Sequence, residues 1–242
     1  MFSLIWHAVF FDPVYNTLVF FIDLFPGGDV GLSIIATVVI VKLLLFPLSI
    51  KAVKTQKIMR DIEPKLREVK EKFKDKRDEL AKATMEIYRE AGMNPFASIG
   101  VMFLQIPFVI ALYLAVLKGG GVPLPGINLD ILYSFIPHPS AVTMNFMGLF
   151  DITGKSMVLA LIAGIAQFFS VRFAMPKPPV RDPNAAPSFK ADFSRNMQLQ
   201  MQYVMPVIIV MTAYTFSATI ALYFVVSNIM TIVQELVVRR HR

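Results

Sequence analysis

Long apolar runs, separated by charged or Gly- and Pro-rich stretches, set the pattern of this chain. The clearest run, Gly31–Ile50, is twenty residues long and carries a single charge, on Lys42. A helix needs about 20 such residues to cross about 30 Å of hydrocarbon. The run therefore predicts a transmembrane helix over 31–54, with a kink near its end caused by Pro47.

Further apolar runs predict four more crossings. Residues 96–117 and 154–174 each have the length of one span. Residues 204–238 would extend about 52 Å as a single helix, which is too long for one crossing. Basic residues flank both ends of this stretch, so we expect two helices joined by a tight turn at 216–219. The predicted fold is an all-α integral membrane protein with a five-helix transmembrane bundle.

The stretch between the first two spans, residues 55–95, is highly charged but has a regular apolar pattern. Its apolar positions recur at spacings of three and four, as in the seam of a coiled coil. The seam comprises Met59, Ile62, Leu66, Val69 and Phe73, and then Leu80, Thr84 and Ile87. We expect a cytoplasmic helical hairpin, with Pro64 near the start of its first arm, where proline is tolerated. A solvated linker is the alternative.

The remaining segments connect or flank the predicted helices. Residues 1–30 mix aromatic and aliphatic side chains with Asp, Asn and Pro, which favours an external, interfacial, amphipathic segment. An additional crossing is the alternative. Residues 118–153 are expected to form an external loop, 175–203 a cytoplasmic loop and 239–242 a cytoplasmic tail.

Composition and charge support this membrane topology. The chain has 242 residues, is 55% hydrophobic and has a mean hydropathy of +0.59, which is typical of an integral membrane protein. Residues 1–30 carry no Lys or Arg, whereas 51–95 carry thirteen and 172–203 carry five. Because basic loops stay in the cytoplasm, we expect a multi-pass protein of the cell (inner or cytoplasmic) membrane. Its N-terminus would lie outside and its C-terminus in the cytoplasm.

Lys42 is the most informative residue of the predicted bundle. It lies nine residues before Lys51, which marks the water boundary, and is therefore roughly 13 Å deep. A cation at that depth costs about 2.5–3.5 kcal/mol on insertion scales, and its side chain is too short to reach the surface. Two interpretations remain: a neutral amine in a dry bundle, or an amine facing a water-filled cavity, which we favour.

The chain lacks the residues that most membrane chemistry requires. It has no cysteine, and its three histidines, His7, His138 and His241, lie outside the predicted spans. The spans contain no pair of carboxylates, and no Gly-rich phosphate loop is present. We therefore expect no catalytic residue, metal site or cofactor, and a protein that is not an enzyme.

The polar residues that remain favour a passive role in the bilayer. Lys42, Gln105, Gln167, Ser227 and Asn228 could line a hydrophilic groove that reduces the desolvation of polar segments entering the membrane. For the uncharged residues, ordinary hydrogen bonding between helices is an equally good explanation. A small-solute channel or carrier, and a scaffold for membrane-protein assembly, are the alternative functions.

Several blocks of the sequence resemble the YidC-type membrane protein insertases of bacteria, mitochondria and chloroplasts. These blocks are VKLLLFPLSIKAVKTQKIM, IEPKLREVKEKF, IYREAGMNPFASIGVMFLQIPFVIALY, MQYVMP and ALYFVVSNIMTIVQE, in family order. The resemblance covers about residues 31–240. It implies five core helices around a groove that is open to the cytoplasm and the lipid and closed externally.

The resemblance also implies a function and two site residues. Lys42 matches the position of the family's groove arginine, and Gln167 is similar to its groove glutamine. The expected activity is insertion of small membrane proteins, alone or with the Sec translocon. Expected partners are newly made membrane proteins, the lipid bilayer, the Sec translocon and the ribosome, with no specific nucleic-acid motif. Lysine keeps the charge of the arginine but lacks its planar, bidentate donor geometry.

Overall fold

The computed structural model describes residues 2–73, 76–92, 97–174 and 199–240. The chain divides into two compact units, which we describe separately. The first unit contains Met1–Leu43 and Pro107–His241, and the second contains Leu44–Ile106. The first unit holds the N-terminal helix, most of the apolar helices and a long connecting segment.

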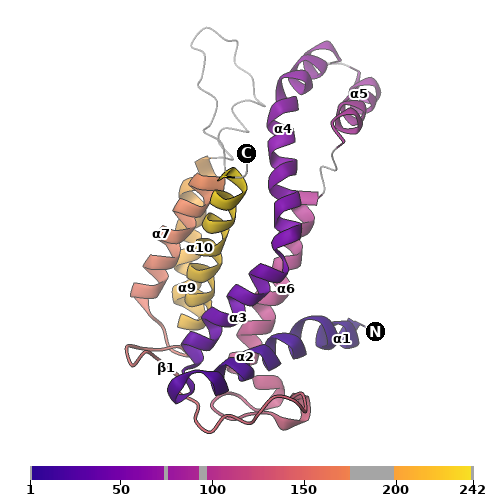
Figure 1. Ribbon diagram of the computed structural model, residues 1–242. Helices are drawn as coiled ribbons and strands as arrows, with labels where there is room; N and C mark the ends of the chain where they lie inside the picture. Colours follow the sequence, from indigo (N-terminus) through magenta and orange to yellow (C-terminus); the bar gives the residue numbers. More distant parts are fainter. Residues whose placement is uncertain (1, 74–75, 93–96, 175–198, 241–242) are drawn as a thin grey trace. The chain divides into compact units, whose positions relative to one another are not determined.

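The first unit begins with a continuous helical stretch of three elements. Helix α1 (Phe2–Ile5), the π-helical η1 (Trp6–Phe11) and α2 (Asp12–Leu24) follow one another without a break. One face of α2 is buried in the main core, where it packs with α3, α6 and α10. This face comprises Val14, Tyr15, Leu18, Val19 and Ile22. In Figure 1, α2 lies crosswise to α7, α9 and α10.

Helix α3 (Val30–Leu44) starts at an acidic cap. A carboxylate oxygen of Asp29 accepts a hydrogen bond from the backbone N–H of Leu32 at 3.0 Å, which satisfies a free donor of the first turn. The helix ends at Leu44, and α4 begins at Phe46 with Pro47 in its first turn. The sequence predicts one kinked helix here, whereas the structure has two helices separated at Leu45.

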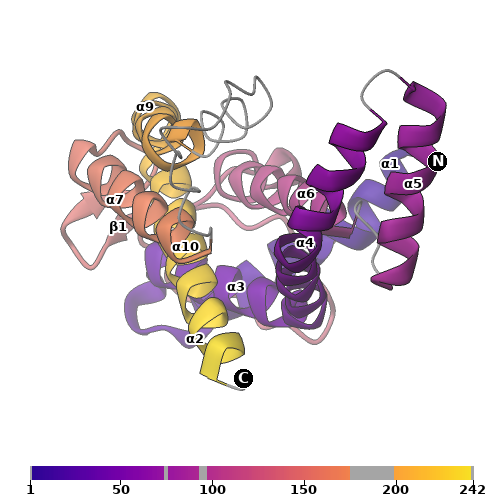
Figure 2. The ribbon, with the colours of Figure 1, turned by 90° about the horizontal axis from the view of Figure 1, so that it is seen from above.

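Three apolar helices lie side by side in the first unit. They are α7 (Met157–Ala174), α9 (Met205–Phe216) and α10 (Ala218–Arg240), as Figures 1 and 2 show. Small residues permit close packing, since a side chain at Gly164 would collide with Val210. Ser217 has an extended backbone and separates α9 from α10, within the region where a turn is expected.

Most of the expected cytoplasmic loop, 175–203, lies outside the described residues. Its end is not a loop. Leu199 is helical and Gln200–Val204 form the π-helical element η5, which continues directly into α9. The apolar and amide side chains of this stretch carry no turn signal, and helix formation satisfies their backbone groups.

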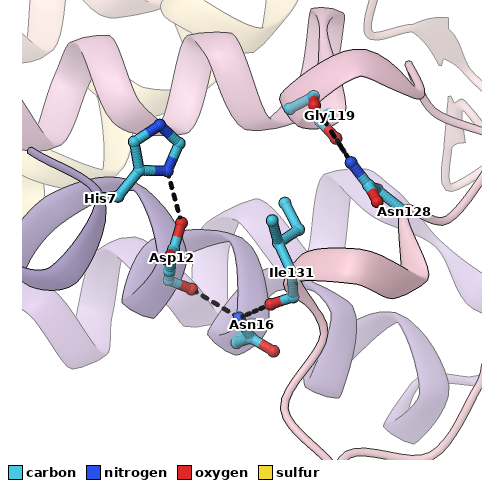
Figure 3. A network of polar contacts seen from close by, with 7 residues as sticks. His7, Asp12, Asn16, Gly119, Asn128 and Ile131 are labelled. Carbon is cyan, nitrogen blue, oxygen red and sulfur yellow. Dashed lines mark hydrogen bonds and ion pairs between the residues drawn. The ribbon is translucent and has the colours of Figure 1, made fainter. Parts of the chain in front are cut away.

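The connecting segment, defined here as residues 118–156, is tied to α2 by polar contacts. It contains short 3-10 turns at Gly119–Gly121 (η3) and Leu129–Ile131 (η4) and a hairpin of β1 (Asn145–Phe146) with β2 (Phe150–Asp151). Asn16 donates to the carbonyls of Asp12 and Ile131, both at 2.8 Å (Figure 3), and accepts from the N–H of Tyr133. The segment therefore has a fixed structure despite its few regular elements.

Asn128 provides a second attachment of the connecting segment. Its side chain donates to the carbonyls of Gly119 and Gly120, and its backbone N–H donates to the hydroxyl of Tyr15 at 2.8 Å. Together, Asn16 and Asn128 with their partners form what we call the loop clamp. Both side chains are buried, and each forms hydrogen bonds through its carbonyl oxygen as well as its NH₂ group.

The second unit contains a helical hairpin. Helix α4 (Phe46–Lys72) is followed by α5 (Arg77–Glu90), and Ile62 and Leu66 are buried against a partly buried set. This set comprises Ile58, Ile87, Tyr88 and Ala91. Pro64 lies inside α4 rather than near the start of an arm, so its expected position is wrong. Pro47 instead occupies the first turn, where a missing N–H is harmless.

The structure supports an all-α, multi-pass membrane protein. In the described part of the chain, three helices are long and apolar enough to cross a bilayer: Ser3–Leu24, Met157–Ala174 and Ala218–Val237. Val30–Leu44 and Leu104–Leu117 are apolar but shorter. The N-terminal helix, expected to be interfacial, is thus also long enough to span. A bundle of five crossing helices stays a prediction.

Candidate functional site around Lys42

Lys42 is buried within the first unit. It lies in the last turn of α3, and the residue is only 8% exposed. Its ammonium donates to Oγ1 of Thr231 on α10 at 3.4 Å. The Thr231 hydroxyl itself donates to the carbonyl of Ser227 at 2.8 Å, so its lone pairs remain available to the ammonium.

A second contact joins the two helices at the same position. The side-chain amide of Gln234 donates to the backbone carbonyl of Lys42 at 3.3 Å. The last four carbonyls of a helix lack partners within it, and α3 ends at Leu44. Gln234 therefore caps the C-terminal end of α3. A cation in this last turn is also favoured by the helix dipole.

The α10 side of the site is a buried polar face. Ser227, Thr231 and Gln234 follow one another at spacings of four and three, and Asn228 and Glu235 adjoin them. Ser227, Asn228, Gln234 and Glu235 are each less than a tenth exposed. Among the described residues, the Nδ2 group of Asn228 finds no hydrogen-bond partner. This face therefore carries buried polar side chains, whereas most of α10 is apolar.

The expected site residues do not all meet. Ser227 and Asn228 lie on the polar face of α10 beside the partners of Lys42. Gln167 lies on α7, half-buried, and within the described chain it makes no hydrogen bond to Lys42. Gln105 is partly buried on α6 (Ala97–Leu117) and belongs to the second unit. Of the expected residues, only Ser227 and Asn228 therefore share the face of α10 that contacts Lys42, and the contacts themselves are made by Thr231 and Gln234.

Sequence reasoning missed Thr231, Gln234 and Glu235. A signal for them was present, because Ser227, Thr231 and Glu235 recur every four residues and so share one face of α10. The missing information was that this face meets α3 at the level of Lys42. Residues separated by 189 positions in the chain form that contact.

The electrostatics of the site follow from the imbalance between donors and acceptors. A lysine ammonium has three N–H groups, and the described residues offer it one acceptor, the Thr231 hydroxyl. Throughout the described ranges, no carboxylate forms an ion pair with it. The same ranges contain no group of three or more His, Asp or Glu residues that could hold a metal ion. The site can attract acceptors and anions.

Comparison with known proteins places this chain in a family. The profile of a family described as "60Kd inner membrane protein" matches residues 21–242, which is nearly the whole chain. The chain belongs to this 60Kd inner membrane protein family. The expected relationship to the YidC-type insertases is thereby confirmed, because curated relatives carry that name.

Three curated relatives show how much of the chain is similar to known members of the 60Kd inner membrane protein family. The membrane protein insertase YidC of Oceanobacillus iheyensis is 29% identical over 98% of this chain and 84% of its own length. YidC 2 of Bacillus anthracis is 27% identical over 97% and 81%. YidC of Rhizobium johnstonii is 30% identical over 98% of this chain but only 37% of its own length. These relatives and the apolar helices show that the chain is a multi-pass protein of the cell membrane.

Proposed function

We propose that the chain is a membrane protein insertase that acts without covalent chemistry, and that Lys42 is the central residue of its substrate groove. The observation that carries the proposal is a buried lysine to which the described residues offer one neutral acceptor for its three N–H groups. Such a group favours an incoming polar or acidic segment over the lipid. Family membership supports the same activity.

The proposed mechanism lowers the barrier for polar residues that must cross hydrocarbon. A substrate carboxylate about 4 Å from the ammonium gains on the order of 4 kcal/mol at an effective dielectric constant of about 20. The polar face of α10 offers further donors, including the Nδ2 group of Asn228, which has no partner among the residues that the structure describes. Water and these groups would replace part of the hydration that the segment loses. Gln167 and Gln105 are proposed as additional groove residues.

The proposed topology has five crossings, formed by α3, α6, α7, α9 and α10. The crosswise direction of α2 relative to α7, α9 and α10 supports an interfacial position for the N-terminal helix (Figure 1). The basic residues of 51–95 then lie in the cytoplasm, with the N-terminus outside. The hairpin of α4 and α5 would recruit newly made membrane proteins there, with the Sec translocon and the ribosome as further partners.

The test uses cells depleted of their own insertase and a small membrane protein with an acidic translocated tail. Lys42→Arg should insert this substrate, because it keeps the positive charge. Lys42→Ala and Lys42→Glu should insert it at least about tenfold less, which corresponds to 1.4 kcal/mol of barrier. Lys155→Ala is the matched control, because Lys155 is an exposed lysine of the connecting segment.

Three outcomes would contradict the proposal. Equal insertion by all Lys42 variants would remove the amine from the mechanism. Solute flux through proteoliposomes without insertion would indicate a channel or carrier instead. Loss of insertion only on deletion of residues 55–92, with every Lys42 variant active, would indicate an assembly scaffold. A neutral substrate tail provides the internal comparison, since its insertion should depend less on Lys42 than that of the acidic tail.

A further inference from the structure

A cavity in the first unit is lined by no residue of α10 and is not used by the proposed mechanism. It has a volume of about 220 Å³ and is formed by the N-terminal helix, the end of α6 and the η3 turn. Its lining comprises Trp6, His7, Phe11, Leu114, Lys118, Gly120 and Gly121. Apolar and aromatic groups thus share one cavity with two basic side chains.

Two basic side chains, Lys118 and His7, belong to the lining of this cavity. Lys118 is exposed and, in the described part of the chain, forms no ion pair. One nitrogen of His7, Nδ1, lies 2.9 Å from a carboxylate oxygen of Asp12, and Figure 3 shows the other ring nitrogen pointing away from Asp12. Asp12 therefore engages Nδ1 of His7, which leaves the other ring nitrogen for a ligand, and Lys118 is the cationic side chain of the lining.

The cavity cannot close against its own walls. The loop clamp holds the η3 turn in place, because Asn128 binds the carbonyls of Gly119 and Gly120. The opposite wall is anchored by Phe11, which is buried in the main core. Gly121 leaves open space where a side chain would otherwise stand. The site is thus preformed, which reduces the ordering cost of binding.

We propose that this cavity binds a phospholipid with an anionic headgroup. Lys118 and His7 would hold the phosphate, while Trp6, Phe11 and Leu114 contact the glycerol end of the acyl chains. An apolar lining disfavours a free inorganic anion, which would lose its hydration there without compensation. A volume of about 220 Å³ fits part of a lipid rather than a whole drug-sized molecule.

The test exploits the fact that Trp6 is the only tryptophan in the chain. The full-length protein is reconstituted in vesicles containing phosphatidylglycerol or phosphatidylcholine with brominated acyl chains, and quenching of Trp6 fluorescence is measured. Phosphatidylglycerol should quench more strongly. Lys118→Gln should reduce this preference about fivefold, the factor that one basic side chain contributes near an anionic surface. Lys155→Gln, which changes an exposed lysine outside the cavity, should leave it unchanged.

Each other result overturns the proposal in a defined way. Equal quenching by the two lipids, or equal loss of preference in both lysine variants, would show only general attraction to a charged surface. A change of Trp6 emission on adding inorganic phosphate in neutral detergent would indicate a free-anion site.

Leu114→Phe, which fills the cavity, should reduce quenching by phosphatidylglycerol. Insertion by Lys118→Gln should be normal, so failure of this proposal leaves the insertase proposal intact.

Discussion

The loop clamp and the Lys42 site both contain buried polar side chains of the first unit. In the loop clamp the donors and acceptors of these side chains have hydrogen-bond partners, whereas at the Lys42 site some donors have none among the described residues. Asn16 uses both hydrogens of its amide and its carbonyl oxygen, with backbone groups as partners. Lys42 has one neutral acceptor for three N–H groups, and the Nδ2 group of Asn228 has none in the described chain. The difference separates a structural network from a site with unused binding capacity.

This comparison has a physical basis in the cost of incomplete networks. A fully satisfied buried network fixes one arrangement of the backbone, whereas an unsatisfied group costs free energy until water or a ligand supplies a partner. The loop clamp therefore accounts for the fixed structure of a connecting segment with few regular elements. At the Lys42 site, the unsatisfied donors raise the free energy of the folded protein, and an incoming substrate can lower it by accepting hydrogen bonds from them.

The largest effect is expected for Asn16→Ala. This change removes the side-chain partner of Asp12, Ile131 and Tyr133 and leaves backbone groups unsatisfied near the core. We expect destabilisation of about 3 kcal/mol, measured by thermal unfolding of the purified protein in neutral detergent. Thr17→Ala on the same helix removes one local bond to Pro13 and should cost less than about 1 kcal/mol. Equal effects would refute the special role of the loop clamp.

The next effect has the opposite sign. Lys42→Met replaces a buried ammonium by an apolar side chain of similar length, which removes the burden of an under-satisfied charge. We expect stabilisation of about 2 kcal/mol in the same unfolding measurement, together with reduced insertion of acidic substrates. Destabilisation of comparable size would show that Lys42 serves mainly to join α3 to α10.

Asn228→Leu should behave like a weaker version of Lys42→Met. The Nδ2 group of Asn228 is buried without a partner among the described residues, so its removal relieves a desolvation cost. We expect stabilisation of about 1 kcal/mol. Ser217→Ala provides a comparison, because the Ser217 hydroxyl is also buried without a partner in the described part of the chain but lies between α9 and α10, away from Lys42. Ser217→Ala should leave insertion unchanged, and Asn228→Leu should reduce it.

The contrast also explains what the sequence could reveal. A single charge in a twenty-residue apolar run made Lys42 visible without a structure. Asn16 carried no such signal, because Asn in a mixed segment is typical of a membrane interface. Its partners Ile131 and Tyr133 lie 115 and 117 positions away, and local spacing does not encode contacts at that distance. Polar side chains whose hydrogen-bond partners lie far away in the sequence are therefore the ones that cannot be identified from the sequence alone.

Helix boundaries show the same limit at shorter range. The apolar runs gave α6 and α7 close to their observed bounds, because length and hydropathy decide such helices. Pro47 predicted a kink within one helix, whereas the structure has two helices, because the break falls at Leu45 and Pro47 lies in the first turn of α4. Gln234, which caps the end of α3, became meaningful only after that interruption was located.

The smallest effect concerns Asp151, at the exposed end of β2. Hydrogen bonds from the hydroxyl and backbone N–H of Thr153 lower the pKa of this carboxyl below its ordinary value. Because the folded pKa is the lower one, the stabilisation is present above the unfolded pKa and is lost as pH falls through the folded pKa. Asp151 is exposed, so solvent screening limits the effect to a few tenths of a kcal/mol.

Asp151→Asn tests this sign directly. The variant should lower stability slightly at neutral pH and should be indistinguishable from the parent protein in acid below the folded pKa of Asp151. Unfolding temperatures measured in parallel over the acid range give the difference between the two proteins. A difference that grows as pH falls would contradict the assigned hydrogen bonds. Insertion should be unaffected throughout, because Asp151 lies in the connecting segment and is not part of the proposed groove.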